Sequence, residues 1–266
     1  MTPITSLQNQ RVKDAIKLRD RRQRTRQGRM LIDGARELSR AIDAGVELLE
    51  IFVCESLCHT DDARRLLPRL ESSGAELLPV TPEVFAKLAF GDRAEGVLGV
   101  ARTPTPRLDG LRLPDEPLVA VAENLEKPGN LGAVLRSADA AGVSAVLAAG
   151  GGTDLYNPNV IRASLGTIFT LPVAAAPTPE VVAWLRERKF RIYAARVDAE
   201  QLYTDVSYAG AVAIVLGSEA AGLTDAWSGD DVTPIKLPMC GAADSLNISA
   251  AAAVLFYEAL RQRTNG

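Results

Sequence analysis

Histidine and cysteine, which often supply bases, nucleophiles and metal ligands, are scarce in this chain of 266 residues. The single histidine, His59, lies in a polar stretch typical of an exposed loop, so any histidine base would have to be this residue. The three cysteines are an odd number, and the Cys-x-x-x-Cys spacing of Cys54 and Cys58 lacks the further ligands of a zinc site. We therefore expect free thiols, as in a cytosolic protein, and no metal.

Long apolar segments and the familiar nucleotide-binding signatures are also missing. The longest apolar runs, such as AVAIVLG at 211–217, are far too short to cross a bilayer. No charged, apolar and small-residue pattern opens the chain, so we expect no signal peptide and a cytoplasmic protein. The glycine-rich AAGGGTD at 148–154 does not spell G-x-G-x-x-G, and no P-loop sequence occurs. These absences argue against a nicotinamide-dependent oxidoreductase and against a P-loop NTPase.

Positive charge is concentrated in residues 1–30, although the net charge of the chain is −3. This segment holds nine arginines or lysines against two aspartates. A concentration of largely unpaired positive charge suits the neutralisation of nucleic-acid phosphates. The alternative is the solvated face of an ordinary helix. The charge pattern alone leaves both interpretations open.

Helical and extended patterns alternate along the first hundred residues and predict a small α/β domain at 1–101. Its helices are expected at 9–27, 35–45, 61–74 and 81–90, and its strands at 29–34, 47–54, 75–80 and 96–101. The proline-rich stretch at 102–117 carries no periodic pattern and predicts an interdomain linker.

The remaining residues, 118–266, alternate again and contain more apolar strands. Strands are expected at 118–123, 144–150, 191–196, 211–217 and 231–238, and helices at about 130–141, 157–164, 178–188 and 247–262. Strands that are apolar on both faces are typical of a buried parallel sheet covered by helices. The sequence therefore predicts an α/β protein with a small amino-terminal domain and a larger parallel-sheet domain.

Two polar motifs follow strands of the larger domain. In NLEKPGNLGAVLRSADAAGV at 124–143, Asn130 follows a Pro-Gly turn and Arg136 comes six residues later. Taken alone, Asn130 fits the N-cap of a helix, and Arg136 fits an exposed surface. In IVLGSEAAGL at 214–223, a strand ends at Gly217 and Glu219 lies in the loop beyond it. Ligands of open α/β sheets bind there, although a plain strand-to-helix turn would look the same.

The third motif is LPMCGAADSLN at 237–247, a strand end and a loop of small residues that leads into an alanine-rich helix. Ser245 or Asn247 would serve as the N-cap of that helix. Capping requires only one polar residue, however, and it does not explain the long loop of small residues. A ligand held by this loop would explain it.

In their order and spacing, the three motifs resemble those of the SpoU, or TrmH-like, family of RNA ribose 2′-O-methyltransferases in the SPOUT superfamily. The resemblance covers about 118–262, and residues 1–100 more loosely resemble the substrate-binding domain that many members carry. The matching positions are Asn130, Arg136, Gly217, Glu219, Gly222, Leu237, Pro238, Met239, Ser245, Leu246 and Asn247.

This resemblance implies S-adenosylmethionine bound in loops at the carboxyl ends of strands, and a carboxyl-terminal trefoil knot that chain physics alone would not predict. The implied catalytic residues are Asn130, Arg136, Glu219, Ser245 and Asn247, and the implied cofactor contacts are Gly217, Leu237 and Leu246. Asn130 would orient the ribose. Arg136 would hold a phosphate and stabilise developing negative charge, because a guanidinium stays protonated and is no base.

The resemblance also implies a homodimer with the site at its interface. An amino-terminal domain with a basic helix suits a large folded RNA that is recognised by shape and phosphates, which favours ribosomal RNA over transfer RNA. A non-catalytic RNA-binding protein on the same fold is the alternative, and it would bind RNA without transferring a methyl group. The intact set of motif residues argues against that alternative.

Overall fold

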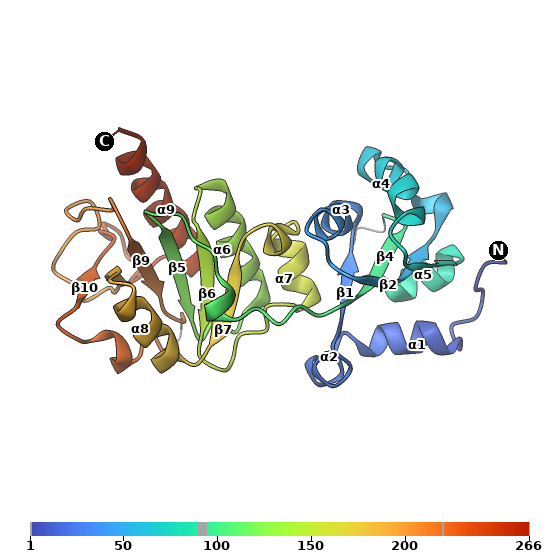
Figure 1. Cartoon of the computed structure of the whole chain (residues 1–266), viewed down its shortest axis with the longest axis horizontal. Helices are drawn as coiled ribbons and strands as arrows, with labels where there is room; N and C mark the ends of the chain where they lie inside the picture. The colour runs from blue at the N-terminus through green and yellow to red at the C-terminus, as the bar shows by residue number, and fades with distance from the viewer. Residues whose placement is uncertain (1, 90–94, 220, 266) are drawn as a thin grey trace. The chain divides into compact units, whose positions relative to one another are not determined.

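The computed structural model describes residues 2–89, 95–219 and 221–265. The chain divides into two compact units (Figure 1). One unit comprises Met1–Thr105 with Tyr156–Thr170, and the other comprises Pro106–Leu155 with Leu171–Gly266. Both units combine helices with a sheet, which confirms the predicted α/β class. Among the described residues, no helix is long and apolar enough to cross a membrane.

The first unit is built on a mixed four-stranded sheet in the order β1-β4-β2-β3. Strand β4 is antiparallel to β1 and β2, whereas β2 and β3 are parallel. The strands are β1 (Arg29–Asp33), β2 (Leu48–Val53), β3 (Glu76–Pro79) and β4 (Val97–Arg102). The helices are α1 (Gln10–Lys17), α2 (Arg21–Gln27), α3 (Ala35–Asp43), α4 (Asp61–Glu71), α5 (Pro82–Leu88) and α7 (Pro158–Ala163), with short 3-10 turns η1 (Glu55–Leu57) and η3 (Thr167–Phe169). Phe90, the expected end of one helix, lies outside the described residues.

Helix α7 belongs to the first unit although its sequence lies between strands of the second. Arg162 on α7 pairs with the buried Asp33 at the end of β1, with 3.2 Å between Nη1 and Oδ2. Arg40 of α3 donates a hydrogen bond of 2.6 Å to the carbonyl of Leu165. At Gly166 a Cβ atom would lie 3.0 Å from the Cα of Glu37, so glycine permits this close packing.

The expected single helix over 9–27 is wrong, because the chain forms two helices there. Asp20 begins α2 as its N-cap, and its side chain accepts from the backbone N–H of Gln23. Arg24 is buried and donates to the carbonyls of Leu18 and Arg19, at 2.8 and 2.7 Å. It therefore satisfies carbonyls that the end of α1 leaves open. The charges of this segment are less available than the sequence suggested.

The second unit contains a six-stranded sheet in the order β10-β8-β9-β5-β6-β7, and all of its neighbouring strands are parallel. The strands are β5 (Leu118–Glu123), β6 (Ala145–Ala149), β7 (Val173–Ala176), β8 (Arg191–Ala195), β9 (Val212–Leu216) and β10 (Val232–Ile235). Five of them were expected from the sequence. Strand β7 was not, because alanine, which supplies three of its four residues, has little preference for strands.

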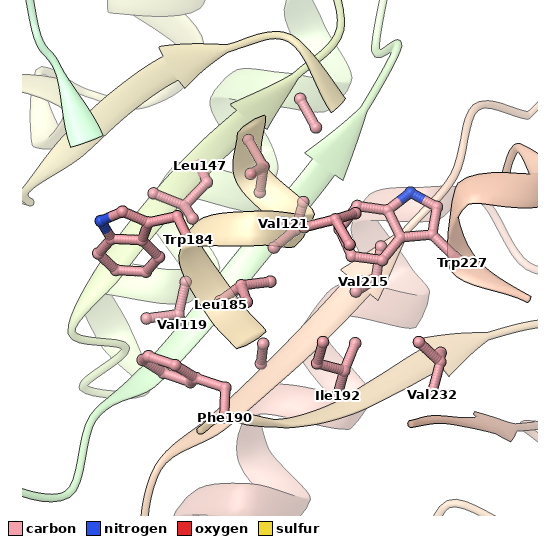
Figure 2. Packing of buried hydrophobic residues seen from close by; sticks show 14 of the residues in the cluster. Val119, Val121, Leu147, Trp184, Leu185, Phe190, Ile192, Val215, Trp227 and Val232 are labelled. Carbon is pink, nitrogen blue, oxygen red and sulfur yellow. The ribbon is translucent and has the colours of Figure 1, made fainter. Parts of the chain in front are cut away.

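Helices cover both faces of this parallel sheet (Figure 1). Helices α6 (Pro128–Ala140) and α9 (Ile248–Asn265) pack on each other and on one face. Helix α8 (Thr178–Glu187) and the turns η2 (Leu108–Gly110) and η4 (Asp225–Trp227) lie on the other. Side chains alternate along each strand, so Val119 and Val121 both meet the cluster around Trp184 and Trp227 (Figure 2).

Candidate active site

The three polar motifs converge because their strands are parallel and therefore end at the same edge of the sheet. Asn130 lies at the start of α6, after β5. Glu219 lies in the loop that follows β9, the neighbour of β5. Asn247 directly precedes α9, after β10. The three side chains, separated by at least 28 positions in the sequence, are joined by hydrogen bonds.

Glu219 is the centre of this polar cluster, which consists of Lys127, Asn130, Glu219 and Asn247. Its Oε1 accepts from Nδ2 of Asn130 at 2.8 Å and from Nδ2 of Asn247 at 2.6 Å. Its Oε2 pairs with the ammonium of Lys127. The two amides also meet, with 3.3 Å between Nδ2 of Asn247 and Oδ1 of Asn130. One carboxylate therefore fixes side chains at the starts of two helices, α6 and α9.

The predicted position of Asn130 at an N-cap is wrong. Helix α6 begins two residues earlier, at Pro128, and its N-cap is Lys127. Proline fits the first turn of a helix because its missing N–H would have no intrahelical partner there. The side chain of Asn130 is thus free of a capping role and turns to Glu219.

Asn247 both caps a helix and belongs to the polar cluster. Its Oδ1 accepts from the backbone N–H and from the hydroxyl of Ser249, at 3.0 and 2.6 Å. Its Nδ2 donates to Glu219. Between the two capping residues that the sequence allowed, Ser245 and Asn247, the structure places Asn247 at the start of α9. The capping interpretation and the site interpretation are therefore compatible.

The pKa of Glu219 is lowered from its ordinary value, first by the hydrogen bond from Lys127 and also by the hydrogen bond from Asn130. A lowered pKa keeps the carboxyl group ionised at neutral pH. Glu219 is therefore a strong acceptor of hydrogen bonds and a weak base. Its side chain is 28% exposed, so a substrate can reach the cluster from solvent.

A pocket of about 480 Å³ adjoins Glu219, a volume typical of small-molecule sites. Its walls come from the loops after β8, β9 and β10 and from the start of α9. The predicted site residues that line it are Gly217, Glu219, Leu237, Ser245 and Leu246. Arg196 and Asp198, which pair with each other, lie at the pocket wall, and this pairing lowers the pKa of Asp198.

The loop after β9 is folded tightly against itself. Ser218 and Gly222 exchange two backbone hydrogen bonds of 3.1 and 2.9 Å. A Cβ atom at Gly217 would lie 2.4 Å from the carbonyl carbon of Gly222, so only glycine fits there. The absence of a side chain at Gly217 thereby lets the loop pack onto its own backbone.

Arg136 stands apart from the polar cluster. It is exposed, and its side chain forms no hydrogen bond or ion pair with any residue that the structure describes. Six residues separate it from Asn130, which places it about 9 Å further along α6 and about 120° around the helix axis. The structure therefore brings together seven of the eight predicted site residues, at the cluster or in the pocket, and leaves Arg136 free.

Sequence reasoning missed Lys127, to which it gave no role. A lysine in a polar stretch is usually a solvated side chain, and only the folded structure brings it to Glu219. The three cysteines are free, as expected, with Cys54 and Cys58 buried and Cys240 exposed. Burial raises the pKa of Cys58 to about 11, which leaves it a protonated and unreactive thiol. Within the described ranges, no three or more His, Cys, Asp or Glu side chains are grouped to hold a metal ion.

Comparison with known families identifies both parts of the chain. Residues 117–257 match the SpoU rRNA methylase family, and residues 9–99 match the MRM3-like substrate binding domain. The chain belongs to the SpoU rRNA methylase family. The resemblance read from the three motifs is thereby confirmed.

Individual members of the family match nearly the whole chain. It is 30% identical over 256 residues to the 23S rRNA (uridine(2479)-2′-O)-methyltransferase of Streptomyces viridochromogenes, covering 94% of this chain and 88% of that protein. A crystal structure of an RNA 2′-O ribose methyltransferase is 43% identical, with a TM-score of 0.87 over 99% of this chain and 100% of that one. The SpoU methyltransferase AviRb from Streptomyces viridochromogenes, in complex with the cofactor AdoMet, is 29% identical, with a TM-score of 0.88 over 97% and 100%.

Proposed function

We propose that this protein transfers a methyl group from S-adenosylmethionine to a ribose 2′-hydroxyl of ribosomal RNA. The observation that carries the proposal is a small-molecule pocket whose wall includes Glu219, the centre of a polar cluster open to solvent. The pocket offers a place for the methyl donor, and the cluster offers one for the ribose. The family relationship supports the same reaction, since the relatives named above are RNA 2′-O-methyltransferases.

The residues of the pocket fit S-adenosylmethionine. Leu216, Leu237 and Leu246 offer apolar contact to an adenine ring. The folded loop at Gly217 presents backbone groups without an intervening side chain, which suits the polar edges of a nucleoside. Arg196 and Asp198 offer opposite charges for the amino and carboxylate groups of the methionine part. We assign Gly217, Leu237 and Leu246 to cofactor binding on this basis.

When bound, S-adenosylmethionine would supply a methyl group that its sulfonium sulfur already activates. The 2′-oxygen would take the methyl group, S-adenosylhomocysteine would be the leaving group, and the hydroxyl proton would pass to solvent, to which the cluster is open. Because the donor is activated, positioning of the ribose supplies much of the rate. Asn130 orients the ribose from the cluster, and Glu219 fixes the amides of Asn130 and Asn247. The low pKa of Glu219 makes it a weak base, so we assign it to positioning. Ser245, in the pocket wall, would contact the reacting groups.

Arg136 is proposed to hold an RNA phosphate beside the target ribose. It is exposed and makes no bond within the described part of the chain, so its five N–H donors are available to a substrate. Its charge would stabilise the negative charge that develops on the ribose oxygen. A guanidinium stays protonated and cannot remove the proton itself.

The first unit is proposed to bind the RNA substrate, as the match to a substrate-binding domain suggests. Lys13 and Arg22 are exposed residues of its basic segment and suit contacts with phosphates. We further propose a homodimer, because Val254 and Tyr257 lie one turn apart on α9 and are 38% and 52% exposed. A protein that modifies ribosomal RNA is expected in the cytoplasm, where ribosomes are matured.

The function is tested by mapping 2′-O-methylated riboses in total RNA from cells with and without the gene. We expect one ribosomal RNA nucleotide to lose its methyl group without the gene. Purified protein and S-adenosylmethionine should restore that methyl group in vitro. Loss of a transfer RNA methyl group would contradict the substrate, and an unchanged map would contradict the activity.

A further inference from the structure

Glu123 is a fully buried carboxylate that none of the roles above uses. It ends β5, whose other five residues are apolar and equally buried. Its oxygens accept three hydrogen bonds. Oε1 accepts from the hydroxyls of Thr178 and Thr224, at 2.9 and 2.8 Å, and Oε2 accepts from the backbone N–H of Thr224, at 2.8 Å. A buried charge is costly unless it is bonded in this way, so the contacts hold the side chain firmly.

Two of the three hydrogen bonds fasten Thr224, which stands at the far end of the loop that carries Glu219. The near end of this loop is fixed by the sheet, since Leu216 of β9 pairs with Ala122 of β5. The far end leads into η4 and is fixed by Glu123. Both ends of the loop are therefore anchored to consecutive residues at the end of β5.

The loop between these anchors cannot easily absorb a displacement. Its backbone is closed by the two bonds between Ser218 and Gly222, and at Gly217 there is no room for even a Cβ atom. A shift of Thr224 would therefore move Glu219 and the pocket wall together. That wall includes Gly217, Ser218, Glu219, Ala221, Gly222 and Leu223.

We infer that Glu123 is a positioning residue, whose buried carboxylate sets the place of the Glu219 loop and thereby the shape of the cofactor pocket. The inference rests on the proposed function for the identity of the ligand. It differs from a purely structural role, in which Glu123 would only support the fold around α8. Thr178, the first residue of α8, donates to the same Oε1 atom from outside the loop, and it provides the matched control.

The experiment compares Glu123→Gln, Thr224→Val and Thr178→Val in the full chain. Calorimetry measures the affinity for S-adenosylmethionine, and hydrogen exchange without cofactor measures the protection of the loop at 217–224. We expect Glu123→Gln and Thr224→Val to weaken the affinity about tenfold, as the loss of a hydrogen bond to a charged group does, and to speed exchange in the loop. Thr178→Val should lower the melting temperature as much as Thr224→Val and change affinity by less than about twofold.

Equal losses of affinity in Thr178→Val and Thr224→Val would overturn the inference, because Glu123 would then act through the fold as a whole. Unchanged loop exchange in both Glu123→Gln and Thr224→Val would overturn it as well. If Glu123→Gln does not fold, Thr224→Val against Thr178→Val still decides the question. If the wild-type protein binds no S-adenosylmethionine, the proposed function fails, and the exchange measurement alone decides whether Glu123 holds the loop.

Discussion

The two units of the chain differ in whether polar side chains gather beside a pocket. In the first unit, arginines complete the fold: Arg24 bonds the carbonyls at the end of α1, and Arg19 donates to the carbonyls of residues 87–89 at the end of α5. In the second unit, Asn130, Glu219 and Asn247 bond one another at an exposed edge, beside a pocket.

Sheet topology accounts for much of this difference. In the second unit every strand is parallel, so the loops after β5, β9 and β10 all emerge at one edge and their polar residues meet there. In the first unit β4 runs against both of its neighbours, so the loops that follow these strands leave at opposite edges. A parallel sheet thus brings distant sequence motifs together at one edge, whereas the arginines of the mixed-sheet unit bond to carbonyls at the ends of its helices.

The largest effect is expected for Glu219→Gln, which removes the charge at the centre of the cluster. Methyl transfer should fall about a hundredfold to a thousandfold, as on loss of a preorganised charged group, while RNA affinity stays unchanged. Single-turnover transfer of tritiated methyl groups and filter binding measure the two quantities. Asp231→Asn is the matched control, since Asp231 also pairs with a cation, Arg186, but lies outside the site. If Glu219→Gln transferred methyl groups at the wild-type rate, the polar cluster would have no role in the mechanism.

Arg136→Ala should lower the rate of methyl transfer about a hundredfold, as the loss of one hydrogen-bond donor to a developing negative charge does in other enzymes. The melting temperature and the affinity for S-adenosylmethionine should stay constant, because Arg136 bonds to no described residue. Arg136→Lys should recover only part of the rate, since an ammonium cannot replace the planar fork. Arg112→Ala, at another exposed arginine of the second unit, serves as the control. Near wild-type transfer by Arg136→Ala would contradict the phosphate-holding role.

Lys127→Met should lower the rate of methyl transfer by about tenfold or less at neutral pH, because Glu219 stays ionised at that pH. In the folded protein the pKa of Glu219 lies below its ordinary value. The ion pair with Lys127 is therefore complete at pH values above the ordinary pKa, and it is lost as the pH falls through the folded-state pKa. Without Lys127 the pKa of Glu219 rises, so the decline of kcat/KM on the acid side of the pH profile should move to higher pH. A profile of kcat/KM against pH checks this. An unmoved acid limb would mean that Lys127 does not govern this carboxylate.

The smallest effects on catalysis are expected in the basic segment of the first unit, where two neighbouring arginines should behave differently. Arg24→Ala removes two hydrogen bonds, one to the buried carbonyl of Leu18 and one to the part-buried carbonyl of Arg19, and should cost about 2 kcal/mol of stability. Arg22→Ala should leave the melting temperature unchanged and weaken RNA binding. The slope of log K for RNA binding against log salt concentration should fall by about one, the contribution of one phosphate contact. Thermal melts and salt titrations of RNA binding measure both. Equal melting temperatures for the two variants would contradict the structural role of Arg24.

The sequence predicted those elements whose patterns are strong. Strands β5 and β9 were predicted from runs rich in valine and other apolar residues, and α8 from its helical periodicity. Strand β7 was missed because alanine gives little strand signal. The break between α1 and α2 was missed because Asp20, the N-cap of α2, lies between two arginines in a continuous polar segment, where it does not stand out as the start of a helix.

The candidate site was predicted mainly through the family resemblance, and its contacts needed the fold. The sequence does not state that β9 lies beside β5, and only this order brings Glu219 to Asn130. Lys127 carried no signal of its own. Glu123 did carry one, because a charged residue that ends an otherwise apolar buried strand needs a partner.

The central claim is that Asn130 and Glu219 act as one unit on the ribose. Its most direct test is a double-mutant cycle of Asn130→Ala and Glu219→Gln, with single-turnover methyl transfer to ribosomal RNA as the measurement. We expect the double variant to be no slower than the slower single variant, because either substitution already disables the unit. Losses that multiply in the double variant would contradict the claim, since the two side chains would then act independently.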